Sequence, residues 1–267
     1  MASFRIKKYQ INTKKLPAGK GLTFVLLADL HNKEYGPENK RLIAAVKEQK
    51  PDGILIAGDM LVGHTAQSFL PAQRLVLALQ EQVAPVFYGN GNHESRMRVQ
   101  TEIYGDRYRE YMEPLSRAGV QVLSNASTRF EKMGCQVEIH GFELDLSYYQ
   151  KLGDKELEPV ALTEALGSPG TGIYHILLAH NPVYFRQYAA WGADMTLSGH
   201  LHGGVIRIPF LGGVITPQVR LFPKYDRGLF WIGEKALLVS PGLGTHTVNI
   251  RIFNPAQLFV IRLEGEA

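Results

Sequence analysis

The chain has 267 residues, of which 45% are hydrophobic, and its 29 Lys and Arg against 25 Asp and Glu give a formal net charge of +4. This length suffices for one large domain with a substantial core. The charges are mixed along the chain, which indicates a solvated surface and argues against a nucleic-acid interface. The single cysteine, Cys135, excludes an internal disulfide framework and a cysteine-based zinc site. We expect this thiol to pack as a small apolar residue in a strand.

No apolar run reaches the ~20 residues that span a bilayer, and the N-terminus lacks the apolar core of a signal peptide. We therefore expect a soluble protein that is cytoplasmic or lies on a membrane face. The opening Met1-Ala2-Ser3 resembles a remnant of expression cloning, so an anchor upstream of the printed sequence stays open.

In chain order, the N-terminal third alternates between apolar runs and amphipathic segments. Buried strands are predicted over 22–28, 54–57 and 85–88, because these runs are continuously apolar. Helices are predicted between them, over 39–50 and 71–82, each with its apolar residues on one side. This order is typical of parallel βαβ units with helices on the sheet faces.

The rest of the chain continues the α/β pattern with shorter elements. A helix is predicted over 104–118, and a surface excursion rich in Glu, Lys, Gly and Pro over 145–170, with one short helix near 158–166. The C-terminal quarter is rich in Gly, Pro and β-formers, which favours hairpins. The remaining predicted elements are strands at 120–123, 127–132, 137–141, 174–179, 195–197 and 258–263 and a helix at 183–190. Without a repeat or a linker, the simplest prediction is a single α/β domain over 1–267 with two sheets.

Side chains able to bind metal follow directly after five of the predicted strands. In open α/β sheets, ligands bind at the carboxyl ends of the strands, so we expect these side chains to converge. Side chains alternate between the two faces of a strand. Residues two positions apart therefore point in the same direction, if strand geometry continues past the apolar run. The five segments are Asp29-Leu30-His31, Gly58-Asp59, Gly89 to Glu94, His180-Asn181 and Gly199-His200-Leu201-His202.

The chemistry of these side chains is coherent. Carboxylate, imidazole and amide oxygen together suit Mn²⁺, Fe²⁺ or Zn²⁺. A carboxylate can bridge two ions, and two ions ~3.5–4 Å apart can bind the attacking and the leaving oxygen of an in-line displacement. Each residue alone has an ordinary alternative: Asp29 and Asp59 as turn or cap residues, Asn92 as a turn residue, and His180 as a buried structural histidine. The complete ordered set is far more specific than any member.

This ordered set resembles the calcineurin-like metallophosphoesterase family, whose motifs match in type and order between residues 29 and 202. Two later segments, 203–209 and 240–244, resemble a bacterial branch of that family, which includes membrane-associated phosphodiesterases and hydrolases of lipid-linked sugar nucleotides. The resemblance implies an α/β fold in four layers, a two-sheet βαβ sandwich flanked by helices.

The resemblance also implies a role for each motif residue. Asp29, His31 and His202 would hold one metal ion, Asn92, His180 and His200 a second, and Asp59 would bridge both. His93 would be no ligand but the general acid or transition-state stabiliser near the leaving group. Glu94 would orient His93 or shape the turn. One departure is that many relatives carry a second acidic residue shortly after the Gly-Asp motif, whereas residues 60–64 contain none.

Several residues outside the motifs are weaker candidates. Arg207 and Arg251 are candidates for phosphate contact because guanidinium matches phosphate, with surface ion pairing as the equal alternative. His246, in a glycine-rich loop, is a candidate for a second-shell or substrate role. The other expectations are that His64 is a solvated loop residue, that His175 is structural, that His140 could line the pocket, and that Tyr104, Tyr108 and Tyr111 form an amphipathic helix face.

The predicted function is hydrolysis of phosphate esters, most simply of phosphodiesters, by a hydroxide bridging two divalent metal ions (Mn, Fe or Zn). The alternatives are a pyrophosphate hydrolase for a lipid-linked sugar nucleotide, a non-catalytic scaffold, and a nuclease, which predicts a basic groove for which the sequence offers little support. We expect a phosphate-ester substrate, no nucleic-acid partner and a possible peripheral membrane association. The physiological substrate, the native metal and the oligomeric state stay open, because fold analogy does not determine them.

Overall fold

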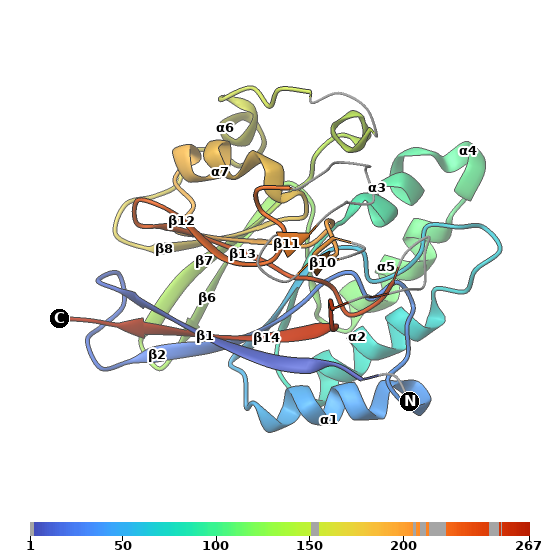
Figure 1. The fold of residues 1–267 in the computed structure, drawn as a ribbon, viewed down its shortest axis with the longest axis horizontal. Coiled ribbons are helices and arrows are strands. Elements are labelled where there is room, and N and C mark those ends of the chain that lie inside the picture. Colours follow the sequence, from blue (N-terminus) through green and yellow to red (C-terminus); the bar gives the residue numbers. More distant parts are fainter. Residues whose placement is uncertain are drawn as a thin grey trace.

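Two six-stranded sheets form the centre of the molecule in the computed structural model (Figure 1). The structure describes residues 3–150, 155–204, 207–208, 212–213, 223–245, 251 and 253–267. In the first sheet β2, β3, β4 and β5 are parallel, β14 is antiparallel to β2, and β1 is parallel to β14. Its strand order is β1 (Arg5–Thr13), β14 (Gln257–Gly265), β2 (Gly21–Leu27), β3 (Gly53–Ala57), β4 (Val86–Gly89) and β5 (Gln121–Leu123).

The second sheet is parallel at its centre and antiparallel at both edges. β13, β9, β8 and β7 run parallel to one another, while β12 and β6 pair with them as antiparallel edge strands. Its strand order is β12 (Gly228–Ile232), β13 (Lys235–Val239), β9 (Met195–Ser198), β8 (Tyr174–Ala179), β7 (Cys135–Phe142) and β6 (Ala126–Lys132). A separate two-stranded pair joins β10 (Arg207–Ile208) to β11 (Gly212–Gly213).

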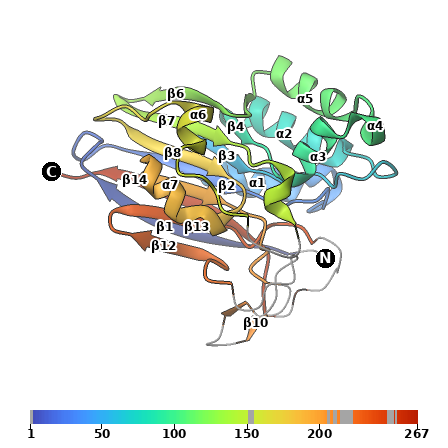
Figure 2. The same ribbon diagram turned by 90° about the horizontal axis from the view of Figure 1, so that it is seen from above.

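Helices cover the outer face of each sheet, and Figure 2 shows α6 lying over β7 and α7 lying beside β13. Buried residues of the first helix group pack on the first sheet, and those of α6 and α7 pack on the second. The helices of the first group are α1 (Lys40–Glu48), α2 (Leu70–Gln82), α3 (Asn92–Val99), α4 (Thr101–Tyr104) and α5 (Arg107–Arg117), followed on the second sheet by α6 (Ala161–Leu166) and α7 (Phe185–Trp191). Short 3-10 turns lie at Pro37–Asn39, Leu146–Tyr149 and Pro182–Tyr184. The result is the four-layer α/β sandwich implied by the resemblance.

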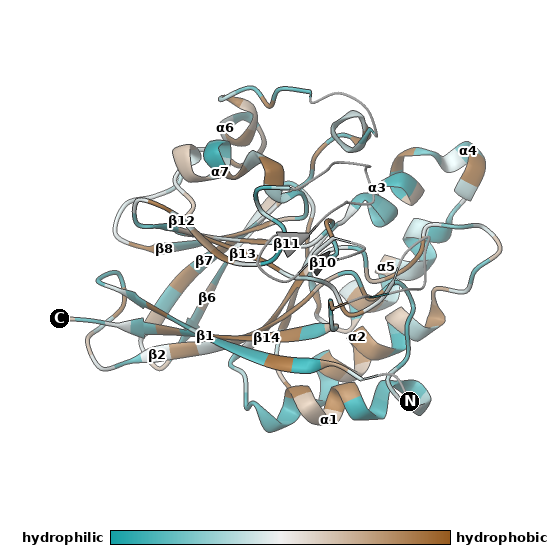
Figure 3. Ribbon diagram, in the orientation of Figure 1, coloured by the Kyte–Doolittle hydropathy of each residue, from teal (hydrophilic) through white to brown (hydrophobic). Residues whose placement is uncertain are grey.

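Three apolar layers hold these four structural layers together. The strands alternate, so that Phe24 and Leu26 of β2 face the space between the sheets while Val25 and Leu27 face the helices. Burial on both faces explains why the central strands are continuously apolar in sequence. Figure 3 shows α1 and α2 with both hydrophobic and hydrophilic residues, as expected for helices with one face on a sheet. Cys135 is buried in the layer between the sheets, which confirms its predicted packing.

Three features of the fold differ from the sequence prediction. The edge strand β1 was not predicted, because most of its residues are exposed and only Ile11 is buried. The helix predicted over 104–118 is interrupted at Gly105, whose φ of 55° ends α4, and α5 begins at Arg107. The helix α3, directly before α4, was also not predicted, because its sequence lacks an apolar residue at each helical turn.

The segment predicted as a surface excursion is only partly superficial. Leu157 and Leu162 are buried against the helical face of the second sheet. Residues 151–154 lie outside the part of the chain that the structure describes.

None of the helices in the described ranges is long and apolar enough to cross a membrane. The assignment of 1–267 to one domain stays a prediction.

Candidate metal centre

Loops after β2, β3, β4, β8 and β9 meet at the carboxyl ends of the two sheets and bring the predicted side chains together. The loops after β2 and β3 run side by side, with Asp29 N donating to Gly58 O at 3.0 Å and His31 N donating to Asp59 O at 3.2 Å. From the second sheet, Gly199 N donates to His180 O at 3.0 Å, which joins the loops after β9 and β8. The site therefore straddles both sheets.

Asp29, His31 and His202 form one group whose ligand atoms all lie within 4.8 Å of one another. The Nε2 atoms of His31 and His202 are 3.1 Å apart. Oδ1 of Asp29 lies 3.6 Å from Nε2 of His202 and 3.9 Å from Nε2 of His31. Ligands at zinc–nitrogen distances of 2.0–2.1 Å in a tetrahedron are separated by about 3.3 Å. The three side chains are therefore spaced to hold one metal ion.

Asp59, His180 and His200 form a second group of the same kind. His180 Nε2 is 3.1 Å from Asp59 Oδ2, and His180 Nδ1 lies 2.6 Å from the Ala57 carbonyl oxygen. Because a carbonyl only accepts, Nδ1 donates to it and Nε2 is the nitrogen that faces the group, as in the outer hydrogen bonds of metal-binding histidines. Without a metal ion the Asp59 carboxylate holds a second proton on Nε2, which a bound ion would replace. His180 Nε2 is also 3.8 Å from Asp29 Oδ1, so the two groups adjoin.

Asn92 and His93 begin α3 beside the second group. The side-chain oxygen of Asn92 is buried and has no hydrogen-bond partner among the described residues, a costly state that a metal ion would relieve. His93 Nδ1 accepts a hydrogen bond from Gly63 N at 2.9 Å, which leaves the proton on Nε2, 3.9 Å from Asp59 Oδ2. His93 also forms a possible ligand group with His31 and Asp59.

The electrostatics of the site also fit divalent cations. Burial raises the pKa of Asp29 to about 7, and the neighbouring Asp59 adds to this shift. Burial alone would raise the pKa of Asp59, but the imidazoles of His180 and His93 hold it well below its ordinary value. Burial would lower the pKa of His180, yet the carboxylate of Asp59 raises it to about 10. Two buried carboxylates among imidazoles are a donor set that divalent ions of intermediate hardness prefer.

The backbone of these loops is left-handed where the ligand candidates lie. φ is 49° at both Asp29 and His31, 55° at Asp59, 69° at His200 and 51° at His202. The condition for strand alternation between Asp29 and His31 is not met, since β2 ends at Leu27, although the two side chains do lie in one ligand group. His200 and His202, by contrast, belong to separate groups. Left-handed backbone at a non-glycine residue costs ~1–3 kcal/mol, and such residues concentrate at functional sites.

Close approach of these loops requires glycine at Gly58 and Gly199. A Cβ on Gly58, whose φ is 86°, would lie 2.4 Å from the backbone nitrogen of Gly91. A Cβ on Gly199 would lie 2.4 Å from Asp29 Oδ2. The absence of a side chain lets His200 N donate to both carboxylate oxygens of Asp29, at 3.0 and 3.1 Å.

Glu94 is fully buried and shapes the turns around Asp59. Its Oε2 accepts hydrogen bonds from Asp59 N and Gly91 N, both at 3.0 Å, and its Oε1 accepts from Met60 N at 2.9 Å and Tyr88 OH at 2.7 Å. These bonds are to backbone amides and a phenol, so of its two expected roles the turn-shaping one matches the geometry. The loop after β3 thus has a buried carboxylate partner although it carries no second acidic residue.

The three weaker substrate-binding candidates have different outcomes. The side chain of Arg207 and all of His246 lie outside the described residues. The guanidinium of Arg251 donates to the carbonyls of Pro241 at 2.8 Å and Gly242 at 3.2 Å, and also to that of Gly244. Arg251 therefore fastens the 240–244 loop instead of forming a surface ion pair, and phosphate contact by it stays a prediction.

The remaining predictions, for histidine and tyrosine residues, also have different outcomes. His64 is exposed, as expected, and His175 is buried in β8. His140 faces the helical layer on the second sheet, next to Trp191, and does not line the site. Tyr104, Tyr108 and Tyr111 pack on the helical core, though Tyr104 belongs to a separate helix.

One neighbour of the site was missed in the sequence. The ring centroid of Tyr149 lies 5.0 Å from that of His200 and 6.2 Å from that of His180. Burial raises the pKa of Tyr149 well above its ordinary value. No local pattern marks this residue, because its approach depends on how the segment after β7 folds back.

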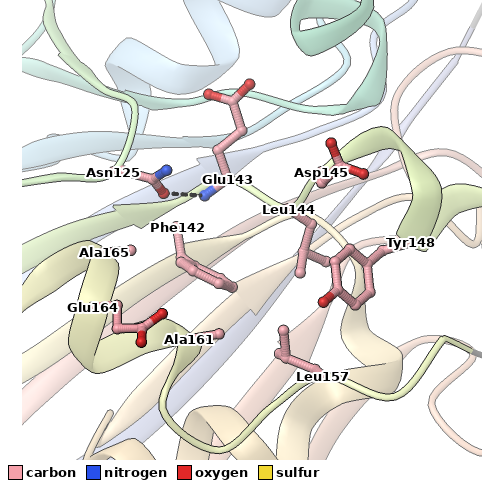
Figure 4. A pocket seen from close by; sticks show the side chains of 10 residues that line it. All are labelled: Asn125, Phe142, Glu143, Leu144, Asp145, Tyr148, Leu157, Ala161, Glu164 and Ala165. Carbon is pink, nitrogen blue, oxygen red and sulfur yellow. Dashed lines mark hydrogen bonds between the residues drawn. The ribbon is translucent and has the colours of Figure 1, made fainter.

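A pocket of about 340 Å³ lies apart from the metal-ligand candidates, none of which belongs to its lining (Figure 4). Glu143, Asp145 and Glu164 belong to its acidic lining, beside Phe142 and Leu144, although the Glu143 carboxylate points away from the other residues and pairs with Arg98 at 3.1 Å. Such a lining repels a phosphate group. The convergent polar centre, and not this pocket, is therefore the better phosphate-ester site.

Comparison with known proteins agrees with this geometry. A metallophosphoesterase of Aquifex aeolicus, itself uncharacterized, is 30% identical over 98% of this chain and 92% of its own length. The phosphodiesterase YaeI of Escherichia coli is 29% identical over 83% of this chain and 74% of its own. The UDP-2,3-diacylglucosamine pyrophosphatase LpxG of Chlamydia muridarum is 24% identical over 93% of this chain and 85% of its own. The model of the calcineurin-like phosphoesterase family matches residues 22–204, which include every residue of the two ligand groups. The chain therefore belongs to the calcineurin-like phosphoesterase family and is a metal-dependent hydrolase of phosphoric esters.

Proposed function

We propose that this chain is a phosphodiesterase that works with two divalent metal ions. The observation that carries the proposal is the pair of adjoining ligand groups, separated by only 3.8 Å between His180 Nε2 and Asp29 Oδ1. Asp29, His31 and His202 would hold one ion, and His180 and His200 the other. Two divalent ions, when bound, lower the pKa of a water and neutralise charge on the phosphoryl oxygens.

Asp59 and Asn92 would complete the two coordination shells. Asp59 lies in a group with His180 and His200 and in another with His31 and His93, which suits a carboxylate shared by both ions. The unpartnered side-chain oxygen of Asn92 supports its assignment to the ion held by His180 and His200. Glu94 would keep Asp59 in place through its bond to the Asp59 amide.

His93 would protonate the leaving alkoxide. Its Nδ1 accepts from the Gly63 amide, so the proton to be given away is on Nε2, on the side of the ring that faces Asp59. To protonate the alkoxide as an imidazolium, the ring would first take up a proton on Nδ1 in place of the Gly63 hydrogen bond, and the Asp59 carboxylate would stabilise the resulting charge. General acid catalysis of this kind contributes ~10²–10⁴ to a rate.

The substrate class follows from the relatives. The name of YaeI supports a phosphodiester. The name of LpxG supports a second candidate, the pyrophosphate bond of a lipid-linked sugar nucleotide. That substrate would require peripheral association with a membrane, which sedimentation with anionic lipid vesicles would detect.

The test compares bis-p-nitrophenyl phosphate, p-nitrophenyl phosphate and UDP-2,3-diacylglucosamine as substrates of metal-stripped protein supplied with Mn²⁺, Fe²⁺ or Zn²⁺. We expect Mn²⁺-dependent hydrolysis fastest on the diester. Anomalous diffraction from Mn²⁺-soaked crystals should show two ions between Asp29, Asp59 and His200. A single ion there, or no metal-dependent hydrolysis of any of the three substrates, would refute the proposal.

A further inference from the structure

Three metal-ligating side chains form a separate cluster on the outer face of the second sheet. Glu138 and His140 are two apart on β7, so both point away from the inter-sheet layer in which Val137 and Ile139 are buried. His175, on the neighbouring β8, is in register with Glu138. The ligand atoms of the three side chains all lie within 4.8 Å of one another.

The spacing of this cluster matches one metal ion. His140 Nε2 and His175 Nδ1 are 3.0 Å apart, and Glu138 Oε2 lies 3.5 Å from His175 Nδ1 and 3.9 Å from His140 Nε2. Tetrahedral zinc with bonds of 2.0–2.1 Å separates its ligands by about 3.3 Å. A small rotation of the Glu138 side chain, the most exposed of the three, closes the difference.

The outer ring nitrogens are held as metal-binding histidines require. His175 Nε2 is 2.7 Å from the Gly170 carbonyl oxygen, which can only accept, so the proton is on Nε2 and Nδ1 presents a lone pair. His140 Nδ1 is 2.6 Å from the hydroxyl oxygen of Ser127, which can accept a hydrogen bond from a proton on Nδ1 and so leave a lone pair on Nε2. Such second-shell bonds fix the tautomer and the ring plane of a ligand.

A hydrogen-bonded relay without metal is the alternative for the two histidines. In that arrangement Ser127 donates to His140 Nδ1, and His140 Nε2 donates to His175 Nδ1. The relay leaves no role for Glu138, whose Oε2 faces both rings while its Oε1 is 3.8 Å from Arg129 Nε. The Glu138 side chain is 20% exposed and Ser127 lies at the surface, so a metal ion can reach the cluster from solvent.

We propose that Glu138, His140 and His175 bind a Zn²⁺ ion, with water as the fourth ligand, at a site separate from the candidate metal centre. The ion joins β7 to β8 and, through Gly170, to the loop before β8. Trp191 of α7 packs edge-on against His140 at 5.0 Å, so the helical layer is tied to the same point. The site is structural, and it does not depend on the phosphodiesterase proposal.

The test measures Zn²⁺ binding by calorimetry in a variant in which both ligand groups of the main centre are disabled, Asp59→Asn with His200→Ala and His202→Ala. One tight site should remain. Adding Glu138→Gln should weaken it at least tenfold, and adding Ser127→Ala should weaken it roughly tenfold, the usual effect of losing a second-shell partner. Arg129→Gln, which leaves all three ligands in place, is the matched surface control and should weaken it less than Glu138→Gln.

Crystals of the unmodified protein soaked in Zn²⁺ give a second readout if the triple variant fails to fold. An anomalous peak should lie among Glu138, His140 and His175. No peak there at a Zn²⁺ concentration that loads the main centre would overturn the inference, as would calorimetric binding that Glu138→Gln leaves unchanged. The location of the peak separates this result from the fate of the phosphodiesterase proposal.

Discussion

Replacing Glu94 with glutamine tests how the loops of the metal centre are held in place. The carboxylate accepts four hydrogen bonds, from the amides of Asp59, Gly91 and Met60 and from the hydroxyl of Tyr88. In glutamine one oxygen becomes an NH₂ group, which can only donate. The least costly orientation places this group at the Oε1 position, because the Tyr88 hydroxyl can rotate and accept from it.

The Met60 amide is then left buried without an acceptor, which costs about 1–3 kcal/mol. The two bonds of Oε2 lose their charge-assisted character as well, so the total destabilisation should be about 2–3 kcal/mol. For a chain of this size, this free energy corresponds to a fall in Tm of about 4–10 °C. Tyr88→Phe removes only the hydroxyl and serves as the control, with a smaller expected loss of about 1 kcal/mol.

Thermal unfolding of wild type and both variants should be followed by circular dichroism in EDTA, so that metal binding does not contribute to Tm. Activity with Mn²⁺ should also fall in Glu94→Gln, since the Asp59 loop is no longer fixed by a carboxylate. A Tm within about 1 °C of wild type would refute the reasoning, because it would mean that no buried donor loses its partner.

Asp59→Asn should abolish hydrolysis and weaken metal binding at both positions, since one carboxylate serves both ligand groups. Asp106→Asn, at an exposed residue, is the control and should change neither property. Wild-type turnover by Asp59→Asn would contradict the bridging role. His93→Ala should retain metal yet lose ~10²–10⁴ in kcat, more on alkyl esters than on nitrophenyl esters, because a general acid matters most for a basic leaving group. Loss of metal in that variant, measured by mass spectrometry, would instead make His93 a ligand. Asp194→Asn should lower the free energy of unfolding by ~1–2 kcal/mol at neutral pH, because Asp194 accepts from the amide of His175 and from two part-exposed lysines. Although burial opposes it, hydrogen bonds from both lysines lower the folded-state pKa of Asp194, so its contribution is present above the unfolded pKa and is lost as pH falls below about 4. Urea unfolding should therefore give a difference between the two proteins that shrinks in acid, and a difference independent of pH would contradict the assignment.

The sequence predicted the central strands well because burial on both faces leaves them continuously apolar, as in β3 and β8. It missed β1, an edge strand whose polar residues face solvent. It also missed α3, because the buried residues of this helix are mostly polar and do not form an apolar face. Pattern methods respond to apolar periodicity, so elements that the fold uses for other reasons carry little signal.

The sequence by itself also determined which side chains meet, because parallel strands place their carboxyl ends at one edge. It did not determine how they meet. The left-handed backbone at Asp29, His31 and His202, the separation of His200 from His202, and the approach of Tyr149 to His200 exist only in the folded molecule. The physical reason is that strained backbone is stable only where long-range bonds over-determine it, such as those from Glu94 to the Asp59 loop, and these bonds join segments far apart in the chain.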